Sequence, residues 1–265
     1  MAKPSKAIKT KTTKPVSSKT GHSNLENELT AKNFIKRLKA HQSETELKKI
    51  RRYFKTEKGE YGHSDKFMGI KMGTLFAIAK EFGEMPISEI EKLLESPVHE
   101  VRAGAVSIMD KASRNKRISG ERLKDFFDLY MRRHDRINNW DLCDLGCLHM
   151  TGSYLYNKPH DILYTLARSK NIWERRTAIL STCYFIRQGD TNDTFKIAEI
   201  LVNDPADLIH KATGWMLRFA GTKDKKGLIS FLDKHAATMP RTLLRYSIEH
   251  FPQRERELYM KMKEG

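Results

Sequence analysis

The sequence predicts an all-α protein, an α-solenoid of HEAT-like helical repeats with a curved, concave surface. Apolar residues recur at intervals of three and four over most of the chain. Short turn signals separate these segments, and related helix–turn–helix segments recur along the sequence. No stretch shows the alternation of apolar and polar residues that is typical of a half-buried strand.

Turn signals set the boundaries of the expected helices. Glycines, prolines and serines fall between the periodic segments, as at Gly59, Pro86, Pro97 and Gly120. In the first half of the chain we therefore expect helices at residues 28–40, 44–55, 73–83, 87–96, 99–112 and 120–134.

Three segments share one pattern: the end of a helix, a polar turn, and a new helix with a basic residue in its first two turns. They are LLESPVHEVRAGAV (Leu93–Val106), LARSKNIWERRTAIL (Leu166–Leu180) and LVNDPADLIHKATGW (Leu201–Trp215). Their basic residues, Arg102, Arg176 and Lys211, are 74 and 35 residues apart. Because 74 is close to twice 37, we expect a further copy near residues 139–141, where the sequence reads NNWDLCDLG. Such intervals are typical of stacked helix pairs.

This alignment of repeats predicts a cluster on the concave wall. Trp140, Arg176 and Lys211 take one equivalent position, and Asp144 and Trp215 lie one turn further along their helices. Two indoles, a carboxylate, a guanidinium and an ammonium would then share one patch. A groove that only binds phosphate needs the cations alone, so the acid indicates either a structural role or chemistry.

Composition points to a polyanionic partner. The 265 residues are 39% hydrophobic, enough for a sizeable core, and carry a net charge of +16 with a pI near 9.7. This excess favours nucleic acid, an anionic membrane surface or an acidic protein. No apolar run is long enough to span a membrane, and no secretory signal is present. We expect residues 1–23 to be a disordered Lys-rich tail and 24–265 to be one helical repeat domain.

The three cysteines, Cys143, Cys147 and Cys183, fall in apolar helical patterns. An odd number in such positions favours buried thiols in a reducing compartment over a disulfide framework. No His or Cys cluster completes a zinc site around Cys143 and Cys147, so we expect neither a metal nor another cofactor. The expected location is cytoplasmic.

Six segments in order resemble the AlkD-type DNA alkylation repair glycosylases, from about residue 30 to the C-terminus. They are FMGIK (Phe67–Lys71), SPVHEVR (Ser96–Arg102), NNWDLCD (Asn138–Asp144), WERR (Trp173–Arg176), KATGWMLR (Lys211–Arg218) and MPRTLLRYSIE (Met239–Glu249). Two positions depart from the family pattern: Lys71 stands in place of a glutamine and Gly73 in place of a proline.

The resemblance implies a solenoid that clasps duplex DNA and releases cationic alkylated purines, such as N3-methyladenine and N7-methylguanine. By the same resemblance, Asp144 is the catalytic carboxylate, Trp140 and Trp215 flank it, Arg176 holds a phosphate, and Tyr53 lies near the lesion. We expect such a protein to be nucleoid-associated, to act as a monomer, and to need no small-molecule cofactor.

The chemistry of cationic purines suits a single aspartate. Loss of the base leaves an oxocarbenium-like sugar, which a nearby carboxylate stabilises while it orients or deprotonates water. No acid is needed for the base, because it departs neutral. Indole faces attract the same cations at about 0.5–2 kcal/mol per contact. Arg176 can grip a phosphate through a forked pair of hydrogen bonds and favour the ionised form of Asp144.

Other candidate residues have simpler interpretations. Asp141 suits a first helical turn, Trp173 suits the core, and His99 suits capping or packing at a helix start. A series of basic residues recurs near the concave-side helices and is expected to contact phosphates: Arg132, Arg133, Arg136, Lys211, Arg218, Arg241 and Arg245.

Three functions remain open from the sequence. The first is a monofunctional alkylpurine DNA glycosylase. The second is a non-catalytic DNA-structure-binding repair scaffold on the same fold. The third is an armadillo-like receptor for acidic peptides, since solenoids also bind peptides in their concave face.

Overall fold

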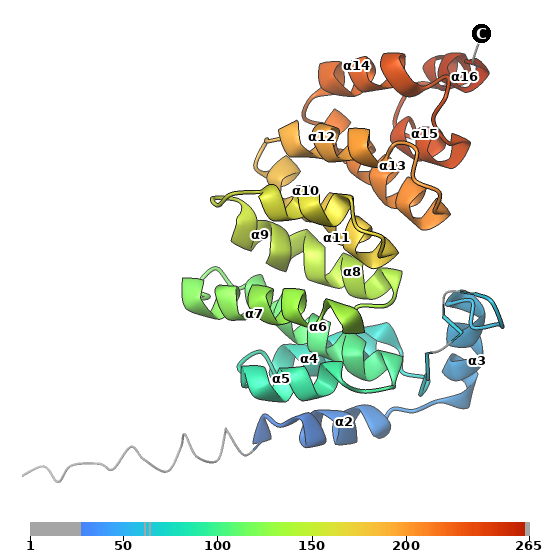
Figure 1. The fold of residues 1–265 in the computed structure, drawn as a ribbon. Coiled ribbons are helices and arrows are strands. Elements are labelled where there is room, and N and C mark those ends of the chain that lie inside the picture. Colours follow the sequence, from blue (N-terminus) through green and yellow to red (C-terminus); the bar gives the residue numbers. More distant parts are fainter. Residues whose placement is uncertain (1–27, 61, 64, 263–265) are drawn as a thin grey trace, which may run out of the picture.

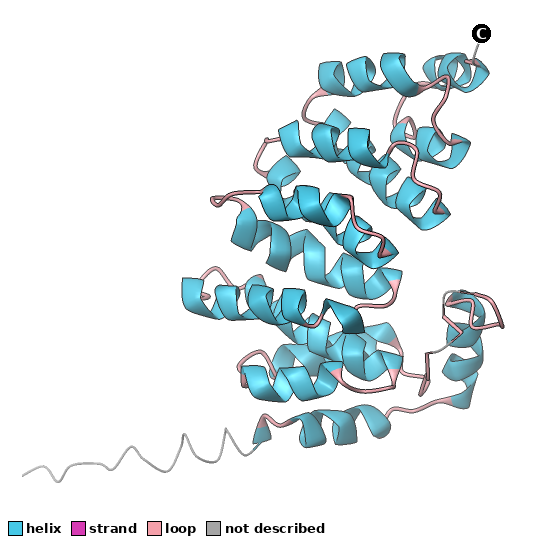
Figure 2. Ribbon diagram, viewed as in Figure 1, coloured by secondary structure: helices cyan, strands magenta, loops and turns pink. Residues whose placement is uncertain are grey.

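The computed structural model describes residues 28–60, 62, 63 and 65–262, so the expected tail at 1–23 lies outside the described residues. Within the described part the chain is helical, with one isolated bridge between Lys66 and Val98 and no strand (Figure 2). The prediction of an all-α fold of stacked helices is confirmed.

Most helices form two rows that run the length of the stack (Figure 1). One row consists of α2 (Ala31–Lys39), α5 (Ile87–Leu94), α7 (Gly120–Arg132), α10 (Asp161–Ala167), α12 (Asn192–Leu201) and α14 (Lys225–His235). The other consists of α4 (Met72–Glu81), α6 (His99–Ser113), α8 (Trp140–Gly146), α11 (Ile172–Arg187), α13 (Asp207–Gly221) and α15 (Arg241–Ser247). Helix α8 continues through a π-helical turn, η2 (Cys147–Thr151), into α9 (Gly152–Leu155). The remaining elements are α3 (Glu44–Tyr53), the 3-10 turn η1 (His134–Arg136) and α16 (Gln253–Lys261).

Side-chain caps explain where several helices begin. The Ser119 hydroxyl accepts a hydrogen bond from the Arg122 amide at the start of α7. Asn139 and Asn171 use their side-chain oxygens in the same way at the starts of α8 and α11. Such caps satisfy first-turn amides that have no partner inside the helix.

The core is one cluster of buried apolar residues from Ala31 to Ile248, and it includes the three cysteines, which are buried free thiols as expected. Tyr130 of α7 is fully buried, and its hydroxyl lies 3.0 Å from Thr177 Oγ1 of α11. A Cβ at Gly146 would lie 2.3 Å from the Tyr130 ring. A glycine is therefore required for α8 to lie this close to α7.

Helix α3 projects from the side of the stack (Figure 1). None of its residues, Glu44–Tyr53, is buried. The segments before and after α3 are hydrogen-bonded to each other, because Ser43 donates its backbone N–H to the Gly69 carbonyl. The Glu100 carboxylate accepts hydrogen bonds from the backbone amides of Met68 and Gly69.

Candidate active site

Helix α8 presents Trp140 and Asp144 on one face, because residues four apart in a helix lie one above the other. The Asn139 cap fixes the start of this helix at Trp140. The Asp144 side chain is 21% exposed, and its carboxylate lines two adjoining cavities. The acid therefore has access to a ligand.

Arg176 of α11 holds Asp144 in place. Its Nε donates to Asp144 Oδ1 at 2.9 Å and its Nη2 donates to Oδ2 at 3.1 Å. Nη1 donates to the Leu208 carbonyl at 2.7 Å, and Arg176 is only 5% exposed. The fork expected to grip a phosphate is thus directed at Asp144 in this structure. Arg176 positions the acid.

The electrostatics of Asp144 combine opposing effects. Burial raises its pKa, the charge and hydrogen bonds of Arg176 oppose that rise, and the Asp141 carboxylate adds to it, which leaves a pKa of about 6. As expected, Arg176 favours the ionised form of Asp144, but it lowers the pKa by less than burial raises it. At neutral pH the carboxylate is mostly ionised and has a proton affinity suited to a general base.

The alignment of repeats expected from the sequence is wrong by one helical turn at α8. The residues that precede α8, α11 and α13 are Asn139, Asn171 and Ala206, so these helix starts are 32 and 35 residues apart. Counted from them, Asp144 is equivalent to Arg176 and Lys211. The reason is that α10 has 7 residues, about one turn fewer than the 10 of α12.

The expected position of Arg102 in the repeats also shifts by one residue. Arg102 donates to the carbonyl of Ser96, six residues earlier, and Arg175 makes the equivalent contact with Ser169. Arg102 therefore corresponds to Arg175 and not to Arg176.

The first of the two cavities, of about 370 Å³, is here called the cationic cavity. Its lining residues are Tyr53, Trp140, Asp144, Arg176, Leu208, Lys211, Trp215, Arg218 and Tyr246. Lys211 forms an ion pair with Asp207 at 2.7 Å, and Arg218 pairs with Glu249. Arg245 is exposed and lines an adjoining cavity together with Lys211 and Arg218. The structure therefore brings both expected indoles and three of the expected cations, Arg176, Lys211 and Arg218, to the acid.

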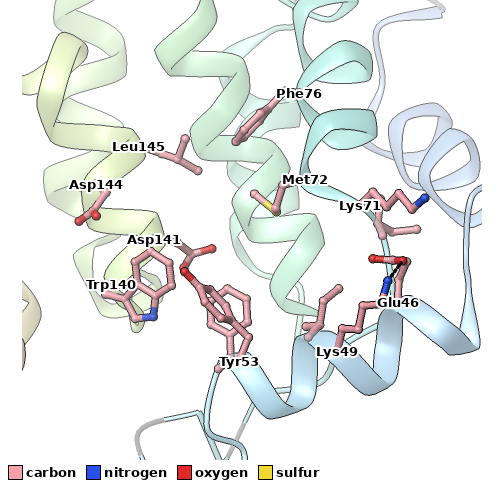
Figure 3. Close-up of a pocket in the computed structure, with 13 residues that line it drawn as sticks. Glu46, Lys49, Tyr53, Lys71, Met72, Phe76, Trp140, Asp141, Asp144 and Leu145 are labelled. Carbon is pink, nitrogen blue, oxygen red and sulfur yellow. Dashed lines mark hydrogen bonds and ion pairs between the residues drawn. The ribbon is translucent and has the colours of Figure 1, made fainter.

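The second, of about 590 Å³, is here called the apolar cavity, and it lies between α3, α4 and α8 (Figure 3). Its lining residues are Glu46, Lys49, Ile50, Tyr53, Phe54, Ile70, Lys71, Met72, Phe76, Trp140, Asp141, Asp144 and Leu145. Lys71, one of the two departures from the family pattern, is thus part of this wall. Tyr53, Trp140 and Asp144 belong to both cavities, so the carboxylate stands where they meet.

Aromatic contacts join α3 to α8. Tyr53, 65% exposed, meets Trp140 edge to face with ring centroids 5.6 Å apart. Phe54 stacks on Trp140 with ring centroids 5.5 Å apart and an interplanar angle of 17°, and it also packs at a tilt against the His99 ring at 4.8 Å. Such aromatic pairs contribute about 0.5–1.5 kcal/mol each beyond the area they bury. They set the width of the apolar cavity at this end.

A buried charge cluster behind Trp140 was missed by the sequence analysis. His99, 1% exposed, lies between Asp141 (Nε2–Oδ2 2.8 Å) and Asp65 (Nδ1–Oδ2 3.4 Å). Asp65 also accepts from Arg102 Nη2 at 2.6 Å and from Asn138. The two carboxylates overcome burial and raise the pKa of His99 to about 9. His99 and Asp141 are structural, as expected, but as an ion cluster and not as a cap.

Only the tertiary fold shows this cluster. Asp65 follows a glycine-containing turn, and nothing in the spacing of Asp65, His99 and Asp141 links them. The one available signal was that the short segment NNWDLCD carries two acids, Asp141 and Asp144, whose roles must differ.

A family model described as "DNA alkylation repair enzyme" matches residues 34–251. The chain belongs to this family. The assignment gives the protein a role in DNA alkylation repair and favours DNA over an acidic peptide as its partner. Among curated proteins no match was found.

A solved structure supports the fold of this DNA alkylation repair enzyme. It is described as "Predicted DNA alkylation repair enzyme from Enterococcus faecalis" and aligns with a TM-score of 0.61 at 18% identity. The alignment covers 80% of this chain and 98% of that chain. At this identity the likeness concerns the fold alone.

Four of the basic residues expected to contact phosphates are engaged by groups of the protein itself. Arg132 and Arg133 form ion pairs with Glu91 of α5, and Arg136 donates to carbonyls at the end of the same helix. Arg241 donates to carbonyls at the end of α16. These guanidiniums satisfy carbonyls and acids of neighbouring helices, which the spacing of charges along a helix cannot reveal.

Among the described residues, no group of three or more His, Cys, Asp or Glu side chains is arranged to hold a metal ion. None of the described helices has the length and apolar character needed to cross a membrane.

Proposed function

We propose that this DNA alkylation repair enzyme is a monofunctional DNA glycosylase. It hydrolyses the N-glycosidic bond of cationic alkylated purines, such as N3-methyladenine and N7-methylguanine, in duplex DNA. One observation carries the proposal: the carboxylate of Asp144 is partly exposed at the junction of an apolar and a cationic cavity, beside Trp140.

The reaction needs one carboxylate. The bond between C1′ and the base nitrogen breaks, and its electron pair neutralises the cationic base, which leaves without protonation. Asp144 stabilises the positive charge on the sugar. Water then adds to C1′ while Asp144 takes its proton, which gives the free base and an abasic sugar. The pKa of about 6 keeps Asp144 ready for both roles at neutral pH.

The surrounding groups divide the binding. The Trp140 and Trp215 indoles offer π faces to the cationic nucleoside. Lys211, Arg218 and Arg245 lie on the cationic side, where a phosphate gains from charge. Arg176 acts through Asp144, which it aligns with two hydrogen bonds.

The test is base release from N7-methylguanine-containing duplex DNA under single-turnover conditions. Asp144→Asn should lower the rate by on the order of 10²–10⁴-fold, because the charge that meets the sugar cation is lost. Duplex affinity should persist. Asp128→Asn, which removes an exposed acid of α7 paired with Lys124, is the matched control and should release base at the wild-type rate. Wild-type release no faster than spontaneous loss refutes the proposal.

A second candidate, a non-catalytic DNA-structure-binding scaffold, is favoured by one observation. Both oxygens of Asp144 accept hydrogen bonds from Arg176, as in a structural ion pair. This candidate requires tight binding of branched or bulged duplexes without base release by the wild type. The same assay therefore separates the two.

A further inference from the structure

One face of α3 carries exposed basic residues at helical spacing. They are Lys48, Arg51 and Arg52, here called the basic face of α3, and the exposed Lys55 follows two residues after the helix ends. Within the part of the chain that the structure describes, none of these four side chains forms an ion pair. The basic face is thus a concentration of positive charge that is open to a partner.

The opposite face of α3 is already in use. Glu46, Lys49 and Ile50 line the apolar cavity, and Lys49 pairs with Glu46 at 2.9 Å (Figure 3). Residues two apart in a helix point about 200° away from each other. Lys48 and Arg52, which are each two residues from Ile50, therefore point away from the cavity and toward solvent.

The charge of the basic face does little for the helix itself. Lys48 and Arg52 are four residues apart, and like charges at this spacing repel each other. The helix dipole favours cations in the last turn, such as Arg51 and Arg52, but its effect does not extend to Lys48. No residue of α3 is buried, so packing does not offset the repulsion. Clustered cations of this kind are typical of a nucleic-acid contact.

The position of α3 places this charge beside the proposed path of the DNA. Tyr53, the last residue of α3, lines both cavities, and its ring meets Trp140 at 5.6 Å. A duplex with a sugar at Asp144 therefore passes the end of α3, next to Arg52. The helix projects from the stack (Figure 1). Its ten residues span about 15 Å, the rise of about four base pairs.

We propose that α3 is a second DNA-contact element, whose basic face binds backbone phosphates of the duplex that flanks the lesion. This inference rests on the proposed action on duplex DNA and adds a contact outside the cationic cavity. Phosphates carry no sequence information. The basic face of α3 therefore contributes affinity and orientation, while Asp144 and its neighbours act on the lesion.

The test removes charge from the basic face and leaves both cavities as they are. Lys48→Gln and Arg52→Gln are made together, because both side chains are exposed and neither lines the apolar or the cationic cavity. Lys48→Arg with Arg52→Lys is the matched control, since it changes the same positions and keeps the charge. Affinity for an undamaged duplex of about 30 base pairs, roughly three turns, is measured at several salt concentrations. Circular dichroism and release of N7-methylguanine at saturating protein are measured in parallel.

The salt slope decides the inference. The neutral variant should lower the slope by about 1.8 units, because each cation that contacts a phosphate contributes about 0.9. Its affinity at about 0.1 M salt should fall by on the order of 10-fold. Its release rate at saturating protein should stay within about twofold of wild type, as for other surface substitutions. The charge-keeping control should retain the wild-type slope.

Two results separate this inference from the proposed function. A wild-type slope in the neutral variant overturns the α3 contact, whatever the rate of base release. A wild-type protein that releases no base refutes the glycosylase, and the salt slope still decides on α3.

An anionic membrane surface is the other partner that a basic face of this kind attracts. Co-sedimentation with vesicles that contain phosphatidylserine tests it with the same variants. If the neutral variant loses vesicle binding and keeps the wild-type slope on DNA, the face binds lipid and the DNA contact is overturned.

Discussion

Two carboxylate–cation groups lie on either side of the start of α8, and they behave in opposite ways. Asp65, with a 3% exposed side chain, pairs with Arg102 and His99, and these partners lower its pKa to about 2 against the effect of burial. Asp144, 21% exposed, pairs with Arg176, yet burial raises its pKa to about 6. Both acids have an arginine at hydrogen-bond distance, so the arginine alone does not decide the result.

The number of hydrogen-bonding and charged partners decides whether the pKa of each acid falls or rises. Asp65 accepts hydrogen bonds from Arg102, Asn138 and Asn139, and faces the charged His99 as well. Asp144 has the Arg176 fork, while the nearby Asp141 repels its charge. A carboxylate that is fully satisfied by the fold is stable and inert. A carboxylate that is bound on one side only, such as Asp144, can still interact with a positively charged ligand. The proposed reaction requires such an interaction.

The largest expected effect is a loss of folding stability at alkaline pH, caused by the buried charge cluster around His99. The pKa of His99 is about 9 in the folded state against 6.5 unfolded, so its charge stabilises the fold fully below pH 6.5, and that contribution is lost as pH rises through 9. The difference corresponds to roughly 3 kcal/mol. Urea unfolding at pH 6 and pH 9.5 should show this loss in wild type and not in His99→Gln. Equal pH dependence of the two proteins would contradict it.

Replacing each acid by its amide should separate the two groups by sign. Folding lowers the pKa of Asp65 from 3.8 to about 2, so Asp65→Asn should destabilise by roughly 2–3 kcal/mol at pH 7. Folding raises the pKa of Asp144 from 3.8 to about 6, so its charge opposes folding above pH 3.8, and Asp144→Asn should not destabilise. Denaturant unfolding of both variants checks this. A loss of similar size in both would make Asp144 a structural acid like Asp65.

The rate of base release should fall at acid pH. Only ionised Asp144 can stabilise the sugar cation, so the single-turnover rate, corrected for spontaneous loss, should drop about tenfold from pH 7 to pH 5. Arg176→Gln removes the cation that lowers this pKa, so the fall should begin at higher pH. If the rate of Arg176→Gln falls over the same pH range as that of the wild type, a group other than Asp144 titrates.

The smallest expected effect is on DNA affinity and concerns Arg245, which lines the cavity adjoining the cationic cavity. Arg245→Ala removes one exposed cation beside Lys211 and Arg218, so it should weaken duplex affinity and lower the salt slope by about one unit, without changing the pH profile. Binding at several salt concentrations measures the slope. Lys196→Ala, an exposed lysine of α12 outside both cavities, is the matched control and should leave the slope near the wild-type value.

The sequence by itself determined the all-α fold, the stacked helices, and the meeting of Trp140, Asp144, Arg176 and Trp215 at one place. These features follow from helical period and repeat interval, which are local properties of the chain. The same local counting misplaced the alignment of α8 by a turn, because a repeat interval averages over helices and α10 is shorter than α12.

Only the tertiary structure decided how the charges are used. Three features join residues more than 30 positions apart in the sequence. They are the hydrogen bonds from Arg176 to Asp144, the buried cluster of Asp65 and His99, and the apolar cavity beside α3. Whether an acid ends up satisfied or available depends on how many donors the fold brings to it and how much water it removes. Neither quantity is written in the spacing of residues along the chain.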